Sequence, residues 1–484
     1  MPRIAFSTLG CKINQYDTAA IQSSVTNGND YTIVPFDGEA DIYVVNTCTV
    51  TGKSDAESRR IIRRALRKNR NARVVVTGCY AQTNPDEIAR IPGVTMILGN
   101  DEKYTLRDYL KYSSEEINDR KIFVGDISKT PVIHSPELTG FPLRTRAILK
   151  IQDGCDSRCS YCIVPFARGA GRSLSPDNVV NQIMSLYRSG GYKEIVLSGV
   201  HLGGYGRDLS PKVSLSSLIK RILSETDIPR VRLSSIEPRE VTDELIKLMS
   251  SEERVCRHLH IPLQSGDDYI LRQMNRNYSA AFYEGLVLKI KGEMEDVGIG
   301  CDVMVGYPGE EEWHFDNTYR FIERLPLTYL HVFAYSPRPG TAAFNLKDSV
   351  RGDIKDRRSE MLRGLGEKKN LYFKNAHAGK VVDVLVEEER DEVTGLLKGY
   401  TGNYLRVLIP LPVAMLRSNG NPAPLEKGGK SPPFLKGDLG GLWGKGGFDQ
   451  GFSDEKTDSS LINSIVSIHI TGIMNGSLSG ELPR

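Results

Sequence analysis

The sequence lacks any long apolar run. No stretch approaches the roughly 18 consecutive apolar residues of a membrane-spanning helix, so we expect no transmembrane segment. The N-terminal residues MPRIAFSTLG are too short and too strand-like for a secretory signal peptide, which predicts a cytoplasmic protein. An excess of one charge sign is also absent, because 63 Lys and Arg face 60 Asp and Glu. A nucleic-acid partner would therefore have to bind local basic patches.

Cysteine is scarce, with eight residues in 484, and in a reducing compartment these do not indicate a disulfide framework. Cys155, Cys159 and Cys162 form a C-x3-C-x2-C motif directly after the strand candidate AILKIQ. Thiolates bind soft metals and iron–sulfur clusters, and three of them on one loop can hold three irons of a cubane and leave the fourth open. A structural zinc loop is the alternative, which the barrel-like strands behind the motif disfavour.

A second group of thiols is dispersed in the sequence. Cys11, Cys48 and Cys79 each come just after a predicted strand, in STLGC, VNTC and VTGC. The loops after parallel strands emerge at one edge of a sheet, so these thiols can converge and hold a second cluster with one free iron. The alternative is that they are small buried side chains. Cys256 and Cys301 have strand-like surroundings, and we interpret them as packing residues.

The chain divides into α/β and β segments. Strand–helix alternation over residues 1–125 predicts a doubly wound parallel sheet, and the proline-rich residues 126–145 predict a linker. Six strand candidates over 146–375 predict an open, partial β/α barrel with its chemistry at the C-terminal strand ends. Short strands over 376–484 predict a small β-barrel. A Gly-, Pro- and Lys-rich stretch at about 417–456 predicts a disordered insertion, with a flexible RNA contact as the alternative.

The cysteine motif, with Tyr161 before its last cysteine, resembles the radical S-adenosylmethionine superfamily. The resemblance implies that the open iron binds S-adenosylmethionine, whose reductive cleavage gives a 5′-deoxyadenosyl radical. Further cofactor contacts are expected where other strands end: Gly199 in LSGVHLGGYG, Ser235 and Glu237 in LSSIEP, Gln264 in HIPLQSG, and Gly306 with Glu310 in VMVGYPGE. We interpret three histidines as pocket or core residues rather than metal ligands: His201, His258 and His260.

A chain with both thiol groups resembles the methylthiotransferases over nearly its whole length. The resemblance implies two 4Fe-4S clusters, with the N-terminal cluster supplying or carrying sulfur and the barrel cluster making the radical. It also implies a second S-adenosylmethionine as methyl donor and a TRAM-like C-terminal barrel. The partners would be an electron donor, such as flavodoxin or ferredoxin, and a sulfur source, and the sequence identifies neither.

Two segments bear on the substrate. LGCKINQYDT and GVHLGGYG look like the MtaB type, which acts on N6-threonylcarbamoyladenosine beside the anticodon of transfer RNA. The MiaB type, which acts on isopentenyladenosine, usually reads GCQMN at the first segment, and the RimO type, which acts on a ribosomal protein, usually reads GCPKN. We therefore expect a methylthio group to be added at C2 of threonylcarbamoyladenosine. Those two types and a non-catalytic iron–sulfur RNA-binding module are the alternatives.

Basic residues crowd a predicted helix from about Lys53 to Asn69, among them Arg59, Arg63 and Arg67. Such a stripe can neutralise phosphates of an anticodon stem, or it can be a solvated helix face. In the C-terminal barrel, Tyr404 and Arg406 are candidates for stacking and phosphate contact, or for filling the barrel.

Overall fold

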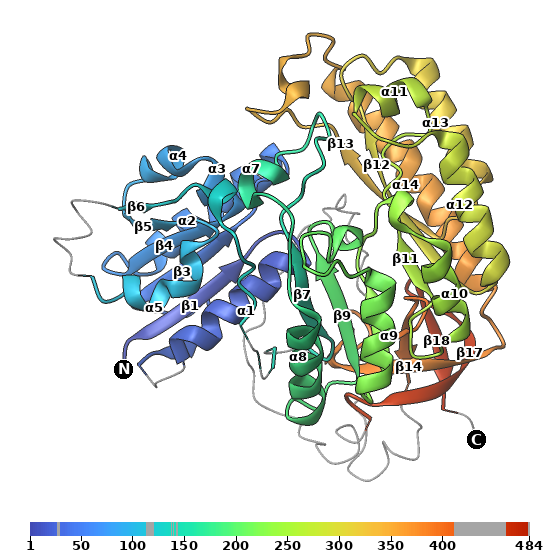
Figure 1. Ribbon diagram of the computed structural model, residues 1–484, viewed down its shortest axis with the longest axis horizontal. Coiled ribbons are helices and arrows are strands. Elements are labelled where there is room, and N and C mark those ends of the chain that lie inside the picture. Colours follow the sequence, from blue (N-terminus) through green and yellow to red (C-terminus); the bar gives the residue numbers. More distant parts are fainter. Residues whose placement is uncertain are drawn as a thin grey trace, which may run out of the picture.

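The computed structural model describes residues 1–26, 30–112, 121–136, 138, 140–141, 144–410 and 461–482. It contains an N-terminal α/β unit, a central partial barrel and a small C-terminal β-barrel, which confirms the predicted fold class (Figure 1). Among the helices in these ranges, none is both long and apolar enough to cross a membrane. The insertion predicted at about 417–456 lies outside the described residues.

The N-terminal sheet has six parallel strands in the order β2-β1-β3-β4-β5-β6. Its strands are β1 (Arg3–Thr8), β2 (Thr32–Val34), β3 (Ile42–Thr47), β4 (Arg73–Gly78), β5 (Val94–Leu98) and β6 (Ile122–Phe123). Its helices are α1 (Lys12–Thr26), α2 (Gly52–Lys68), α3 (Cys79–Thr83), α4 (Pro85–Ala89) and α5 (Leu106–Tyr109). Side chains of α1 and α2 belong to two separate apolar clusters, because successive β3 side chains point to opposite sheet faces. The sheet is therefore covered on both faces, as a doubly wound unit requires.

The central unit has six parallel barrel strands in two short sheets. These are β7 (Ala147–Asp153), β9 (Glu194–Gly199), β10 (Arg230–Leu233), β11 (His258–His260), β12 (Gly298–Val305) and β13 (Tyr329–Ala334). Bridges between β10 and the chain near β11 connect the two sheets, and the short β8 (Arg172–Ser173) pairs antiparallel at the edge of β7. All seven residues of β7 are buried, as expected for a strand covered on both faces. The strands correspond to the six that the sequence predicts.

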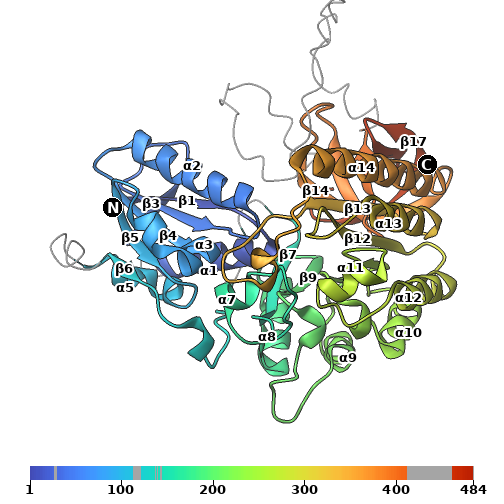
Figure 2. The same ribbon diagram turned by 90° about the horizontal axis from the view of Figure 1, so that it is seen from above.

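Helices enclose this barrel on its outside (Figure 2). They are α8 (Pro176–Arg188), α9 (Leu215–Glu225), α10 (Asp243–Ser251), α11 (Asp268–Gln273), α12 (Ala280–Glu293), α13 (Glu312–Arg324) and α14 (Gly352–Asn375), with α7 (Val164–Arg168) in the loop after β7. The N-terminal sheet lies beside the barrel, and α1 packs against β7 at the boundary. The chain between the two units packs there as well, because the Tyr16 hydroxyl bonds to Ser135 and to the carbonyl oxygen of Pro136.

The C-terminal unit is a closed barrel in the order β14-β15-β16-β18-β17. Its strands are β14 (Val381–Arg390), β15 (Leu397–Thr401), β16 (Arg406–Ile409), β17 (Ile465–Met474) and β18 (Ser477–Glu481). It lies against the N-terminal ends of the central strands, where Arg232 donates to the carbonyl oxygens of Thr401 and Gly402. The small barrel therefore covers the end of the central barrel opposite to the strand ends that carry the predicted chemistry.

Candidate active site

The three N-terminal thiols lie where three neighbouring strands end. Cys11 follows β1, Cys48 follows β3 and Cys79 opens α3 directly after β4. Gly10, at φ +93°, lies so close that a Cβ there would be 2.8 Å from the Cβ of Cys48. Burial, with the nearby thiols of Cys79 and Cys11, raises the pKa of Cys48 to about 12. The parallel sheet thus gathers three thiols at one edge, as the sequence predicts.

The second thiol group occupies the loop between β7 and α7. The Cys155 Sγ lies 3.6 Å from Nδ1 of His201, and the Cys159 Sγ accepts a bond from Nη1 of Arg276 at 3.1 Å. Burial raises the pKa of Cys162 to about 12, and Cys159 and Cys155 add to that shift. These three thiols therefore also lie near one another, and two of them have a nitrogen donor alongside.

Neither thiol group has the spacing of a site for a single ion. In a tetrahedral zinc site with Zn–S bonds of about 2.3 Å, the sulfur atoms are about 3.8 Å apart. Across the described ranges, three ligand atoms of His, Cys, Asp or Glu come within 4.8 Å of one another only at His260, Asp302 and His331. All eight cysteines are free thiols. The donor set and its wider spacing fit a cluster of several irons that bridges three thiolates.

Positive charge lies beside the thiols of the barrel loop. His201 follows β9, and its Nε2 lies 2.8 Å from Oε1 of Glu240. Burial opposes the charged imidazole, but the contacts with Cys155 and Glu240 outweigh it and raise the pKa of His201 to about 10. Arg276 contacts both Cys159 and the carboxylate of Glu237. The predicted contact Glu237 is therefore tied to a thiol through an arginine.

The other predicted cofactor contacts lie at the same end of the barrel. Ser235 follows β10, and its Oγ lies 2.8 Å from Nδ1 of His260. Gln264 adopts φ +65° after β11. Gly306 follows β12 at φ +71°, and its N–H donates to Oε1 of Glu310 at 3.0 Å. Gly199 ends β9, and Tyr161 lies half-buried within the cysteine loop. The strand ends thus bring these residues to the rim that holds Cys155, Cys159 and Cys162.

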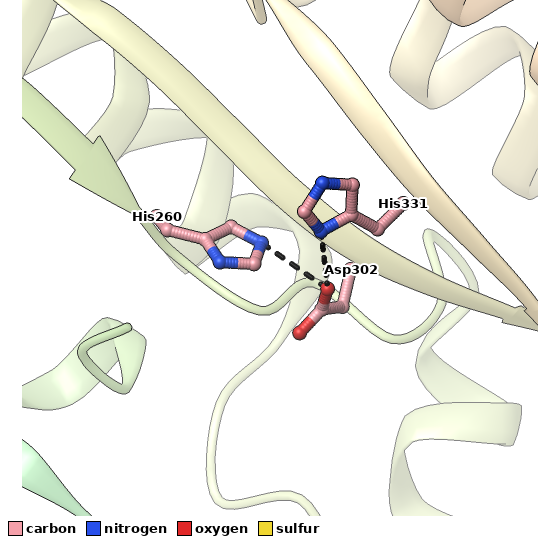
Figure 3. A group of neighbouring side chains, drawn as sticks. All are labelled: His260, Asp302 and His331. Carbon is pink, nitrogen blue, oxygen red and sulfur yellow. Dashed lines mark ion pairs between the residues drawn. The ribbon is translucent and has the colours of Figure 1, made fainter. Parts of the chain in front are cut away.

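A His–Asp–His group crosses the inner face of β11, β12 and β13 (Figure 3). His260 Nε2 and His331 Nδ1 lie 3.1 and 3.4 Å from the same carboxylate oxygen of Asp302. Burial disfavours the carboxylate, but His260 and His331 hold the pKa of Asp302 well below its usual range. The spacing would also suit one metal ion. We keep the interpretation of His260 as a pocket residue, since its second nitrogen faces Ser235.

A buried network of charges lies between the N-terminal unit and the end of β7, just before the barrel cysteines. Arg168, at the end of α7, lies 2.9 Å from Asp17 on α1 and 3.1 Å from Asp153 at the end of β7. Asp17 also pairs with Lys103 at 2.6 Å and with Lys150 at 2.8 Å. Burial disfavours the charge of Arg168, but Asp153 and the thiol of Cys79 outweigh it and hold the pKa of Arg168 well above its usual range. This network is thus the electrostatic connection between the sheet edge and the barrel rim.

Sequence reasoning missed these network residues, as it missed Asp302 and His331. The signal that could have found two of them is their closeness in sequence to the cysteine motif. Asp153 precedes the motif by two residues, and Arg168 follows it by six. Nothing local in the sequence marks Asp17 as their partner.

The basic face predicted for RNA is only partly exposed. Arg59 turns inward and donates to the Tyr80 hydroxyl at 2.7 Å and to Glu87 at 2.8 Å. Arg63 and Arg67 lie exposed on α2, so their contact with phosphates stays a prediction.

In the C-terminal barrel, Arg406 pairs with Asp391 at 2.6 Å. The ring of Tyr404 lies 4.7 Å from that of His258, between centroids. Tyr404 therefore faces the central barrel. Its stacking on RNA stays a prediction.

Comparison with known proteins supports this geometry. Residues 3–99 match a family described as "Uncharacterized protein family UPF0004", and residues 149–322 match the radical SAM superfamily. The chain is 40% identical to the threonylcarbamoyladenosine tRNA methylthiotransferase MtaB of Bacillus subtilis (strain 168), over 84% of this chain and 90% of that protein. It is 38% identical to the protein of the same name from Aquifex aeolicus (strain VF5), over 84% of this chain and all of the relative.

Solved structures show the same fold. The methyltransferase TsrM from Kitasatospora setae, a radical S-adenosylmethionine protein with cobalamin and a 4Fe-4S cluster bound, aligns with a TM-score of 0.53 at 16% identity. The alignment covers 71% of this chain and 77% of that one. At this identity the likeness concerns the fold alone.

Proposed function

Because the chain belongs to the methylthiotransferase family of radical S-adenosylmethionine enzymes, we propose that it adds a methylthio group to C2 of N6-threonylcarbamoyladenosine beside the anticodon of transfer RNA. The observation that carries the proposal is the presence of two thiol trios, one at the sheet edge and one at the barrel rim, with a buried charge network between the two units. The names of the relatives support this substrate over the isopentenyladenosine and ribosomal-protein alternatives.

The barrel thiols Cys155, Cys159 and Cys162 would hold a 4Fe-4S cluster that leaves one iron for S-adenosylmethionine. With both bound, the cofactor supplies the radical chemistry. The chain's own part is electrostatic: His201 and Arg276 place positive charge beside thiolates that carry a cluster. The strand-end contacts would shape the S-adenosylmethionine site: Tyr161, Gly199, Ser235, Glu237, Gln264 and Gly306.

Cys11, Cys48 and Cys79 would hold the second 4Fe-4S cluster, which handles sulfur. Arg168 connects the two thiol-bearing units, because it lies near Cys79 while its own chain segment follows the barrel cysteines. Three cations of this network, Arg168, Lys150 and Lys103, are buried.

The domain boundaries that we propose are residues 1–125 for the sulfur-handling unit, 126–145 for the connection, 146–375 for the radical unit and 376–484 for a TRAM-like unit. Exposed Arg63 and Arg67 would meet the anticodon stem. An electron donor and a sulfur source would complete the reaction.

Two variants test the assignment of roles after anaerobic reconstitution with iron and sulfide. Wild-type protein should hold about eight irons, four for each cubane. Cys159→Ala should abolish reductive cleavage of S-adenosylmethionine, whereas Cys48→Ala should keep cleavage and lose methylthiolation of RNA. Cys256→Ala, at a buried packing position, is the matched control and should retain both activities. Full product from Cys48→Ala would remove the sulfur-handling role from the N-terminal unit.

Mass spectrometry of transfer RNA nucleosides tests the substrate. A deletion strain should lose the methylthio form of threonylcarbamoyladenosine and regain it with the wild-type gene. An unchanged nucleoside profile together with an unmethylthiolated ribosomal protein would contradict the proposal and support the ribosomal-protein alternative.

A further inference from the structure

Four side chains meet at the boundary of the three structural units, where three cations surround one aromatic ring. The Nζ of Lys12, the residue after Cys11, lies 6.0 Å from the centroid of the Tyr404 ring. The guanidinium carbons of Arg146 and Arg232 lie 5.4 and 4.8 Å from the same centroid. Three cations from two different units thus surround one phenol.

Two of these cations pair with a carboxylate and the third does not. Arg146 pairs with Glu387 at 2.9 Å, and Arg232 pairs with Glu194 at 2.6 Å. For Lys12, the part of the chain that the structure describes offers no ion pair and no side-chain hydrogen bond. Lys12 is half-buried. An anionic group beside it would supply a counter-charge that the described residues do not.

Neighbouring groups respond to this excess of positive charge. Burial opposes ionisation of Tyr404, but Arg146 and Lys12 outweigh it and lower the pKa of Tyr404 to about 8. Burial, with the charges of Arg232 and Lys12, holds the pKa of His258 well below its usual range. Both shifts have the sign that a local positive potential produces.

A continuous set of contacts connects this place with the cofactor end of the barrel. The rings of Tyr404 and His258 lie 4.7 Å apart, and Nε2 of His258 lies 2.8 Å from the Tyr329 hydroxyl. The Tyr329 ring lies 5.2 Å from that of His331, which belongs to the His–Asp–His group in Figure 3. These packed rings therefore connect the surroundings of Lys12 with the His–Asp–His group.

We propose that Lys12, backed by Tyr404 and Arg146, is the subsite for the carboxylate of the threonylcarbamoyl group. This inference rests on the proposed function. C2 and N6 lie on the same edge of the purine, so a base whose C2 faces the Cys11 loop places its N6 substituent near the next residue, Lys12. A carboxylate there supplies the missing counter-charge, which an uncharged dimethylallyl group cannot do.

The test compares two synthetic anticodon stem-loops, identical except that the threonine of the modified base is a free carboxylate in one and a primary amide in the other. The reconstituted full-length protein is assayed for methylthiolation of each, and the measured quantity is the ratio of the two kcat/KM values. The variants are Lys12→Met, which removes the charge, Lys12→Arg, which keeps it, and Lys247→Met, an exposed control on α10.

Wild type and Lys247→Met should favour the carboxylate about 10- to 100-fold, the range for a charge-assisted hydrogen bond. Lys12→Met should bring the ratio to about one, and Lys12→Arg should restore part of it. Because the ratio cancels any general loss of activity or iron, a folding defect does not imitate this result. An equal loss on both substrates with an unchanged ratio would mean that Lys12 binds an RNA phosphate, which overturns the proposal, as would a wild type indifferent to the amide. A wild type that cleaves S-adenosylmethionine but modifies neither RNA would overturn the proposed function itself.

Discussion

Replacing Asp17 by Asn removes the central negative charge of the buried network while keeping the shape of the side chain. Asp17 is fully buried, and its carboxylate lies 2.6 Å from Lys103, 2.8 Å from Lys150 and 2.9 Å from Arg168. After the change these three cations would have only Asp153 as a carboxylate partner within the network. Removing one member of a buried pair costs about 3–5 kcal/mol, since an uncompensated charge is left in the interior. We expect the free energy of unfolding to fall by that amount.

Equilibrium unfolding in urea, followed by circular dichroism under anaerobic conditions, measures the loss. Asp30→Asn is the matched control, because Asp30 pairs with Arg107 in the same unit but both side chains are exposed, and it should cost under about 1 kcal/mol. Adding Lys103→Met to Asp17→Asn should recover part of the loss by removing one unpaired cation. If Asp17→Asn were as mild as the control, the reasoning about this network would be refuted.

Three further results are expected. The difference in the free energy of unfolding between wild type and Asp17→Asn should be full above about pH 4 and shrink in acid. The folded pKa of Asp17 lies well below its usual value, so the stabilisation by its carboxylate is lost as pH falls through that folded pKa. A difference that grew in acid would contradict this expectation. The double change Arg63→Gln with Arg67→Gln should weaken transfer RNA binding and lower the slope of log Kd against log salt by about one for each phosphate that the variant no longer neutralises, and an unaltered slope would leave α2 without a role in binding. Gly10→Ala should reduce bound iron from about eight to about four, since its methyl group would lie 2.9 Å from the Cys48 sulfur, whereas Gly352→Ala, with open space at its Cβ, should keep all iron.

The convergence of the dispersed thiols was predictable because it depends on topology. Parallel strands joined by helices bring their C-terminal ends to one edge, so a cysteine after each strand is enough to place Cys11, Cys48 and Cys79 together. The same rule placed Ser235, Gln264 and Gly306 at the barrel rim. Neither inference needed any side-chain detail.

What the sequence did not reveal depends on contacts between distant residues. Arg168 and Asp17 are 151 positions apart, and only the docking of α1 against β7 makes them partners. In the sequence, Arg59 cannot be told apart from the other arginines of α2. In the structure its guanidinium donates a hydrogen bond to the Tyr80 hydroxyl, so the side chain points inward. The strand β18 reads SLSGE, a polar segment with a glycine, and it is a strand because the closed barrel pairs it on both sides.

The position of the C-terminal barrel, against the N-terminal ends of the central strands, has a consequence for the whole enzyme. Buried Arg230 and Arg232 direct their guanidinium groups to backbone oxygens of Asp383, Tyr400, Thr401 and Gly402. Removing the chain from β14 onward would leave both arginines without these acceptors and expose the N-terminal ends of the central strands to solvent. The C-terminal unit therefore closes the N-terminal end of the central barrel and satisfies two of its buried arginines.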